Sequence, residues 1–278
     1  MSKSLSSALV GIALDEGYIK SVEEPITNYI PEFKAEGFDK ITIKHLLTMS
    51  SGFRHTWGNA PWNDSARAYY STDIRKLALS SRIIEGAGKH FNYNSCNTQL
   101  LGIILERVTG RTVSEYMEEK IWKPLGMEYS ASWSMDSERS GFELVAAGLN
   151  ARAIDFARIG RLFLNKGLWE GKRLISEKWI IESTTIDSVS SVMGIENYYP
   201  TDEKNPFYKF FNLDDGYYSY SWYGYPREDD DYDFFALGIL GQFIYVSPQK
   251  KLIIVRCGKE WGEVDWWPEI FRTMADNI

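Results

Sequence analysis

Hydrophobic residues recur at helical spacing over much of the chain before residue 185. Over residues 4–17 they predict a helix that ends at Gly17 and has one apolar face, formed by Leu5, Ala8, Leu9, Ile12 and Ala13. The same spacing predicts helices over residues 45–49, 72–81, 98–109 and 113–121. Residues 57–70 mix aromatic side chains with Asn, Pro and Asp, which indicates a surface excursion.

The most regular amphipathic pattern covers residues 151–167. Its apolar positions are predicted to face the core; these are Ile154, Ala157, Ile159, Leu162 and Phe163. Asp155, in the same segment, is expected to serve the electrostatics of the helix start. A shorter helix is predicted over residues 177–184, with Ser176 as its N-cap.

The pattern changes after residue 215. The stretches YYSYSWYGY, DYDFFALG, QFIYVSP and KLIIVRCG are rich in β-forming residues and are separated by turn residues, so they predict an antiparallel meander. WWPEIFRTMADNI then predicts a terminal helix. The fold class is α+β: an antiparallel sheet flanked by helices, with a mostly helical lobe. We expect one domain over residues 1–278, with the lobe at about 20–135 and the sheet with its terminal helix at about 215–278.

Composition narrows the function classes. Of 278 residues, 44% are hydrophobic and 25% charged, and a net charge of −7 without a Lys/Arg-rich run argues against a nucleic-acid partner. The two cysteines are far apart and the three histidines lack metal-ligand spacing, so no metal or other cofactor is expected. No stretch approaches the roughly 18 apolar residues of a membrane span. The sequence does not identify the cellular compartment of the protein.

Three stretches carry candidate chemistry. Lys3 lies in the first turn of a helix whose body is mostly apolar. FNYNSCNTQLLG places Tyr93 and Ser95 in a loop before a buried helix. ALGILGQFIYV places Gly238 and Gly241 where one strand ends and the next begins.

Together these stretches resemble the serine hydrolase family that contains class C β-lactamases, DD-peptidases and related esterases and amidases. The resemblance covers nearly the whole chain, because TIKHLLTMSSGF, AAGLNARAIDFARIGRLFLNKGLW and QFIYVSPQKKLIIVRCG also match family segments in this order. The YNS and GxxGQ motifs are most similar to the branch that contains 6-aminohexanoate-dimer hydrolase.

The resemblance implies a mechanism. A serine at a helix N-terminus attacks an ester or amide carbonyl and forms an acyl-enzyme, and the S-x-x-K lysine and a tyrosine serve as acid and base. By position, Lys3 matches that lysine, Tyr93 the tyrosine, and Ser95 the last residue of Y-x-N/S, which hydrogen-bonds lysine or substrate. Residues 238–242 match the strand end that supplies an oxyanion N–H, from Leu240 or Gly241, with Leu240 preferred.

Each residue also has a purely structural interpretation. Lys3 could be a solvated residue of a first turn, and Tyr93 could cover the core. Ser95 could only cap the following helix. Gly238 and Gly241 could be strand kinks without a role toward substrate.

The nucleophile is the main departure from the family. The S-x-x-K serine would stand immediately before Met1, and Ser2 and Ser4 point about 100° away from Lys3 on a helix. We therefore expect a chain that begins just after the nucleophile, lacks the N-terminal strands and is inactive as written. Sheet surface exposed in this way would need cover from a missing N-terminal segment or from self-association.

A second departure concerns the substrate. Ile239 and Leu240 stand where relatives often carry Lys or His, so this strand end offers no cation to a substrate carboxylate. The expected substrate is a small uncharged ester or short amide, rather than a β-lactam or a D-Ala-D-Ala peptide. The alternative hypothesis is a non-catalytic ligand-binding protein on the same fold.

Overall fold

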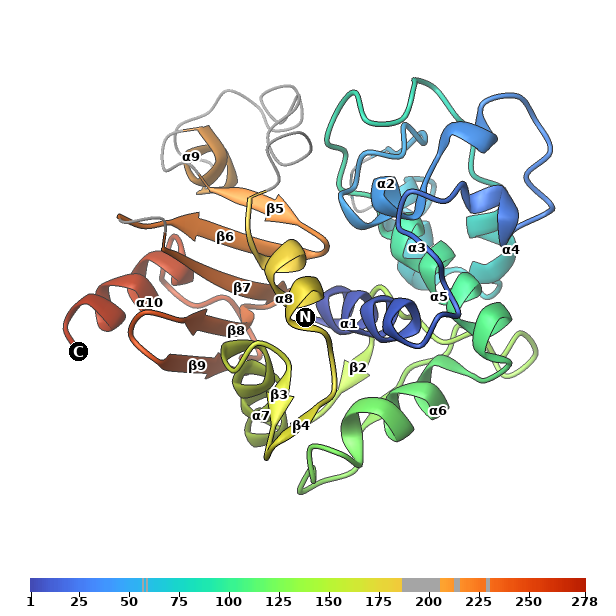
Figure 1. Cartoon of the computed structure of the whole chain (residues 1–278). Helices are drawn as coiled ribbons and strands as arrows, with labels where there is room; N and C mark the ends of the chain where they lie inside the picture. Colours follow the sequence, from blue (N-terminus) through green and yellow to red (C-terminus); the bar gives the residue numbers. More distant parts are fainter. Residues whose placement is uncertain (57, 59, 187–205, 213–215, 229–230) are drawn as a thin grey trace.

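The computed structural model describes residues 1–56, 58, 60–186, 206–212, 216–228 and 231–278. A sheet with its covering helices lies beside a lobe built mainly of helices, and the first turn of α1 lies between the two (Figure 1). This arrangement confirms the predicted α+β class with an antiparallel sheet.

The helical lobe is assembled around α5 (Ser95–Thr109), which contacts α1 (Ser2–Asp15), α2 (Ile43–Leu47) and α4 (Ile74–Leu79). The side chain of Asn94 caps the first turn of α5, and Gly110 ends the helix in a left-handed conformation. The other elements of this part are η1 (Ile26–Asn28), η2 (Phe38–Lys40), α3 (Asp64–Tyr70), α6 (Val113–Met117) and the π-helical turn η3 (Glu118–Trp122).

Among the described residues, the main sheet is an antiparallel meander of five strands in sequence order. These are β5 (Tyr217–Ser219), β6 (Trp222–Pro226), β7 (Tyr232–Gly238), β8 (Gln242–Ser247) and β9 (Leu252–Arg256). Gly238 pairs with Gln242 across the turn that joins β7 and β8.

Side chains alternate between two apolar layers of this sheet. Phe234 and Ile244 belong to the core that includes α7 (Ala153–Leu164) and α1. Phe235 and Tyr245 belong to a second, aromatic cluster with Phe271 of α10 (Trp267–Asp276). The remaining elements are β1 (Ser132–Trp133), β2 (Leu149–Asn150), β3 (Leu168–Trp169), β4 (Lys172–Arg173), α8 (Glu177–Thr184) and α9 (Pro206–Asn212).

Four local predictions have different outcomes. Ser176 caps α8 as predicted, since its side chain accepts a hydrogen bond from the main-chain nitrogen of Trp179. In the described part of the predicted surface excursion over residues 57–70, Trp62 and Tyr70 are exposed, and its second half also forms the helix α3, which was not predicted. Ile154 is 46% exposed instead of facing the core, because the buried face of α7 includes Asp155 and Phe156. Asp155 does more than serve the helix start: fully buried, it accepts a hydrogen bond of 2.7 Å from the main-chain nitrogen of Glu128.

Candidate active site

Helix α1 carries Lys3 into the interior between the lobe and the sheet. Lys3 is 7% exposed, which contradicts the interpretation of it as a solvated first-turn residue. The main-chain nitrogen of Met1 donates a hydrogen bond of 2.8 Å to the carbonyl oxygen of Leu237 on β7. The start of α1 is therefore fixed against the end of a sheet strand.

Three groups surround the Lys3 ammonium. Its Nζ donates a hydrogen bond of 2.9 Å to the carbonyl oxygen of Ala146 and lies 3.5 Å from the hydroxyl of Tyr69. It also lies 4.9 Å from the ring centroid of Tyr93. Burial lowers the pKa of Lys3, but the charges and hydrogen bonds of Tyr69 and Tyr93 outweigh it and leave this pKa above its ordinary value. Lys3 is thus held protonated.

The two tyrosines differ in their surroundings. The hydroxyls of Tyr69 and Ser95 lie 2.7 Å apart and form a hydrogen bond. The Tyr93 ring packs edge-on against Tyr218, with 6.0 Å between ring centroids. Burial raises the pKa of Tyr69, but Lys3 and Ser95 outweigh that effect and lower it below the ordinary value. Burial raises the pKa of Tyr93 and prevails there.

The predicted oxyanion segment adjoins the start of α1. A Cβ atom added at Gly238 would lie 3.2 Å from the nitrogen of Met1. Leu240 and Gly241 have positive φ angles of 63° and 75°, so the turn that they form is left-handed. The Arg256 guanidinium donates to the carbonyl oxygen of Gly241 at 2.6 Å and lies 4.1 Å from the Trp267 ring centroid. This side chain holds the turn from outside the site.

The structure therefore brings Lys3, Tyr93, Ser95 and the end of β7 together around the first turn of α1. Asn94 caps α5, so Ser95 is not needed for that task and its hydroxyl is available to Tyr69. Tyr69 is the residue that sequence reasoning missed. It lies 66 residues from Lys3, and no motif or periodic pattern in its neighbourhood singles it out.

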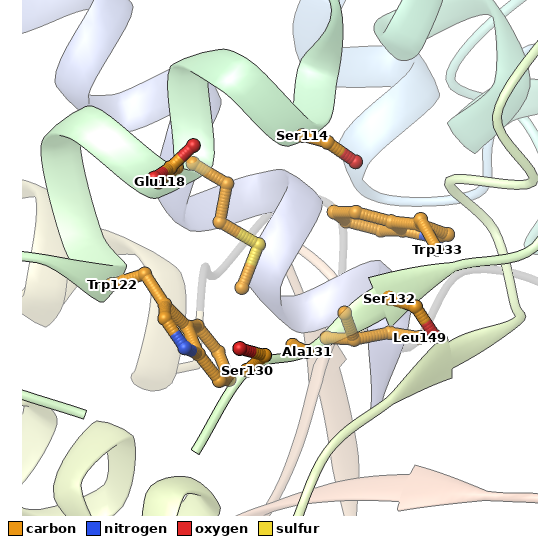
Figure 2. A pocket seen from close by; sticks show the side chains of 9 residues that line it. Ser114, Glu118, Trp122, Ser130, Ala131, Ser132, Trp133 and Leu149 are labelled. Carbon is orange, nitrogen blue, oxygen red and sulfur yellow. The ribbon is translucent and has the colours of Figure 1, made fainter. Parts of the chain in front are cut away.

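The segment that carries Ala146 is held by its own contacts. Trp133 donates its indole N–H to the carbonyl oxygens of Leu144 and Ala147, at 2.8 and 2.7 Å. The main-chain nitrogen of Leu149 donates to the Ser2 hydroxyl at 3.3 Å. Trp133 and Leu149 also line a separate pocket of about 270 Å³, in which Trp122 stands opposite Trp133 (Figure 2).

Within the described ranges, no three His, Cys, Asp or Glu side chains are grouped so as to hold a metal ion. In the same part of the chain, no helix has both the length and the apolar composition that crossing a membrane requires.

Comparison with known proteins places these features in a family. Residues 1–262 match the family described as Beta-lactamase. The chain is 28% identical over 278 residues to 6-aminohexanoate-dimer hydrolase of Paenarthrobacter ureafaciens, an alignment that covers 95% of this chain and 66% of that enzyme. The chain thus spans slightly less than two thirds of the length of this relative.

Solved structures share the fold. A Bacillus anthracis protein assigned provisionally as a 6-aminohexanoate-dimer hydrolase superposes with a TM-score of 0.79 at 24% identity, over 99% of this chain and 71% of that one. A class C β-lactamase in complex with cefoxitin superposes with a TM-score of 0.69 at 16% identity, over 100% of this chain and 82% of that one. The family match covers most of the chain, and the chain belongs to the Beta-lactamase family, in the serine hydrolase superfamily.

Proposed function

We propose that this site hydrolyses a small uncharged ester or a short amide through an acyl-enzyme. The observation that carries the proposal is the buried Lys3 ammonium at the start of a helix, in contact with Tyr69 and Tyr93. The hydroxyl of Tyr69 is in turn hydrogen-bonded to the hydroxyl of Ser95. A buried cation beside ionisable hydroxyls can move protons to and from a reacting group. The name of the Paenarthrobacter relative describes a hydrolase, which supports the same reaction class.

The nucleophile in this proposal is a serine joined to the nitrogen of Met1, which is the position that S-x-x-K spacing requires. A residue at that position would adjoin the end of β7, since the Met1 nitrogen lies 2.8 Å from the Leu237 oxygen. It would also stand at the N-terminus of α1, whose positive partial charge favours a developing anion. The attacking hydroxyl would then lie at the helix N-terminus, where the positive partial charge stabilises the anion that forms during the attack.

We infer the oxyanion N–H from strand geometry. Backbone N–H and C=O groups of alternate residues point to the same side of a strand. The carbonyl of Leu237 points to the start of α1, so the next group on that side is the N–H of Ile239. We therefore favour Ile239 as the oxyanion donor over Leu240 and Gly241, which turn into a left-handed conformation.

The turn also bears on substrate class. The side chains of Ile239 and Leu240 are 83% and 49% exposed and apolar. The neighbouring Arg256 is already hydrogen-bonded to main-chain carbonyls, so it does not offer a free cation to a substrate carboxylate. An uncharged acyl group fits this edge better than a carboxylate-bearing one.

A non-catalytic ligand-binding protein is the second candidate. The observation that favours it is that the hydroxyls of Ser4 and Ser6, near the start of α1, are hydrogen-bonded within the protein. Ser4 donates to the Ser221 carbonyl at 2.7 Å, and Ser6 donates to the Val145 carbonyl at 2.9 Å. Neither hydroxyl is free to attack a substrate.

Hydrolysis of p-nitrophenyl butyrate separates the two candidates. We expect no turnover by the 278-residue chain, and turnover with fluorophosphonate labelling once a serine is added directly before Met1. The matched control carries an added alanine instead. A folded serine-extended chain that binds the ester without cleaving it would favour the binding protein. Fluorophosphonate labelling of the unextended chain would show that another serine is reactive.

A further inference from the structure

A pocket of about 270 Å³ lies between the turn η3 and the strand pair β1–β2, apart from the active site. Its walls are mainly apolar and include Met117, Trp122, Ala131, Trp133 and Leu149. The two tryptophans stand on opposite sides of it (Figure 2). Small-molecule sites in proteins are hollows of this kind, with apolar walls and a few polar groups.

The indole N–H groups of both tryptophans are used within the protein. Trp122 donates to the carbonyl oxygen of Tyr129 at 2.9 Å. Trp133 donates to the carbonyl oxygens of Leu144 and Ala147 at 2.8 and 2.7 Å. These hydrogen bonds fix both rings in place, so a ligand does not have to order the walls of the pocket when it binds. The tryptophans therefore offer a ligand their apolar ring surfaces instead of hydrogen-bond donors.

These ring surfaces are not covered by other rings. Within the described ranges, neither Trp122 nor Trp133 contacts another aromatic ring or lies beside a cation. The two indoles also do not contact each other, so the space between them can take an aromatic ring. Aromatic rings pack favourably on indoles in offset-stacked or edge-to-face arrangements.

The volume of the pocket sets the size of the ligand. A cavity of roughly 150 Å³ that is lined by apolar side chains holds a single benzene ring. The pocket beside Trp133 has a volume of about 270 Å³, so it has room for two fused rings.

The polar groups of the pocket set the charge of the ligand. Among the described residues that line it, Glu118 alone carries a charge, and its carboxylate is paired with the Lys123 ammonium at 2.9 Å. The lining therefore offers no cation to an acid and no unpaired anion to an amine. Ser114 of α6 and Ser130, just before β1, add hydroxyl groups that can donate or accept a hydrogen bond. A neutral hydroxyl group on the ligand fits these partners.

We propose that this pocket binds an uncharged aromatic compound of two fused rings that carries a hydroxyl group. The rings pack against Trp122 and Trp133, and the hydroxyl group bonds to Ser114 or Ser130. This binding does not rest on the proposed function, because the residues that carry it lie outside the active site.

Trp133 gives the pocket a defined place relative to the active site. Its indole N–H holds the carbonyls of Leu144 and Ala147, and the carbonyl of Ala146 between them accepts the hydrogen bond from Lys3. A ligand against Trp133 therefore touches the side chain that holds the main chain on both sides of the partner of Lys3.

The probe is 2-naphthol, added to the 278-residue chain labelled with ¹⁵N in its indole groups and followed by NMR. We expect a saturable shift of the Trp122 and Trp133 indole resonances, which Trp122→Phe and Trp133→Phe assign. Decahydro-2-naphthol keeps the hydroxyl group without an aromatic ring, and it should bind about 10-fold more weakly. The 2-naphthoate anion should also bind more weakly, because the lining offers it no cation.

Two variants locate the binding. Ala131→Phe fills the pocket and should weaken 2-naphthol binding about 10-fold or more. The matched control is Trp62→Ala, which removes a tryptophan that is 78% exposed and outside the pocket, and it should leave the affinity unchanged. Lys3→Met should also keep the affinity, since Lys3 belongs to the active site. Circular dichroism of each variant verifies that the fold is kept.

Four results overturn the proposal. The first is a shift confined to other tryptophans or no saturable shift at all. The second is equal affinity for 2-naphthol and either analogue, which the unmodified chain alone can reveal. The third is an unchanged affinity in Ala131→Phe. The fourth is a loss in Lys3→Met as large as that in Ala131→Phe, which would place the compound in the active site. Because none of these measurements requires turnover, they are independent of whether the serine-extended chain hydrolyses esters.

Discussion

The Nζ atom of Lys3 lies 2.9 Å from the carbonyl oxygen of Ala146, a residue 143 positions later in the chain. A carbonyl oxygen only accepts, so Lys3 must present a proton to it. This hydrogen bond fixes the orientation of the Lys3 ammonium group. The other protons of this group remain available to Tyr69 and Tyr93. The acid–base centre thus depends on the start of the AAGLNARAIDFARIGRLFLNKGLW segment, far from Lys3 in the chain.

Replacing Lys3 by methionine should abolish most of the hydrolysis by the serine-extended chain. Loss of a positioned acid–base group costs about 100-fold or more in kcat/KM, which p-nitrophenyl butyrate turnover measures. Lys178→Met is the matched control, because the Lys178 side chain is 79% exposed on α8. An unchanged kcat/KM in Lys3→Met would contradict the role given to this residue.

Gly102→Ala should destabilise the protein and displace the main chain at Val145 and Ala146. A Cβ at residue 102 would lie 2.6 Å from the Cγ2 atom of Val145, which is fully buried. We expect a loss of about 1–3 kcal/mol in the free energy of unfolding, as for overpacked cores, even though alanine favours a helix. Urea unfolding measures it.

A double-mutant cycle identifies the cause of that loss. If the Val145 contact is responsible, Gly102→Ala should cost less in a Val145→Ala background than in the wild-type chain. Equal costs in both backgrounds would locate the strain elsewhere in α5.

Arg256→Lys should weaken the turn between β7 and β8. Arginine reaches the carbonyls of Gly241 and Glu260 with a planar fork, at 2.6 and 3.1 Å, and lysine cannot reproduce that geometry. We expect a lower kcat/KM in the serine-extended chain and a loss of about 2 kcal/mol in stability. Arg272→Lys, which alters an arginine over the Tyr225 ring, is the control and should leave kcat/KM unchanged. Equal losses in both variants would argue against a specific role for the turn.

The stability of the protein should fall in mild acid because of His55. Burial lowers the pKa of His55 to about 4, from about 6.5 in the unfolded chain. Between these values the unfolded state binds more protons, so the free energy of unfolding decreases as pH falls, by up to about 3 kcal/mol in all. The contribution is fully present above pH 6.5 or so.

His55→Gln should flatten this pH dependence, measured as the difference in urea unfolding between pH 7.5 and 4.5. His90→Gln is the control, since that histidine lies at the surface beside Glu85. A slope that is the same in His55→Gln and in the wild-type chain would show that other groups set the acid response.

Local patterns in the sequence predict much of the scaffold. The stretches of β-forming residues after residue 215, with turn residues between them, correctly predict the meander, because both signals are local. The cap of α8 by Ser176 is also predicted, because a serine hydroxyl just before a helix can accept a hydrogen bond from one of the unpaired main-chain N–H groups of the first turn. The burial of Ile154 is predicted wrongly, since helical periodicity alone does not say where along a helix the neighbouring core begins.

The sequence by itself determined the α+β class and the antiparallel meander, because these depend on short-range periodicity, and its resemblance to a known family singled out Lys3, Tyr93 and Ser95 as candidates. Only the tertiary structure decided that Tyr69 and the Ala146 carbonyl complete the surroundings of Lys3. Such partners are brought together by the packing of α1, α3 and the segment before β2. Contacts between residues so far apart in the chain leave no local pattern in its sequence.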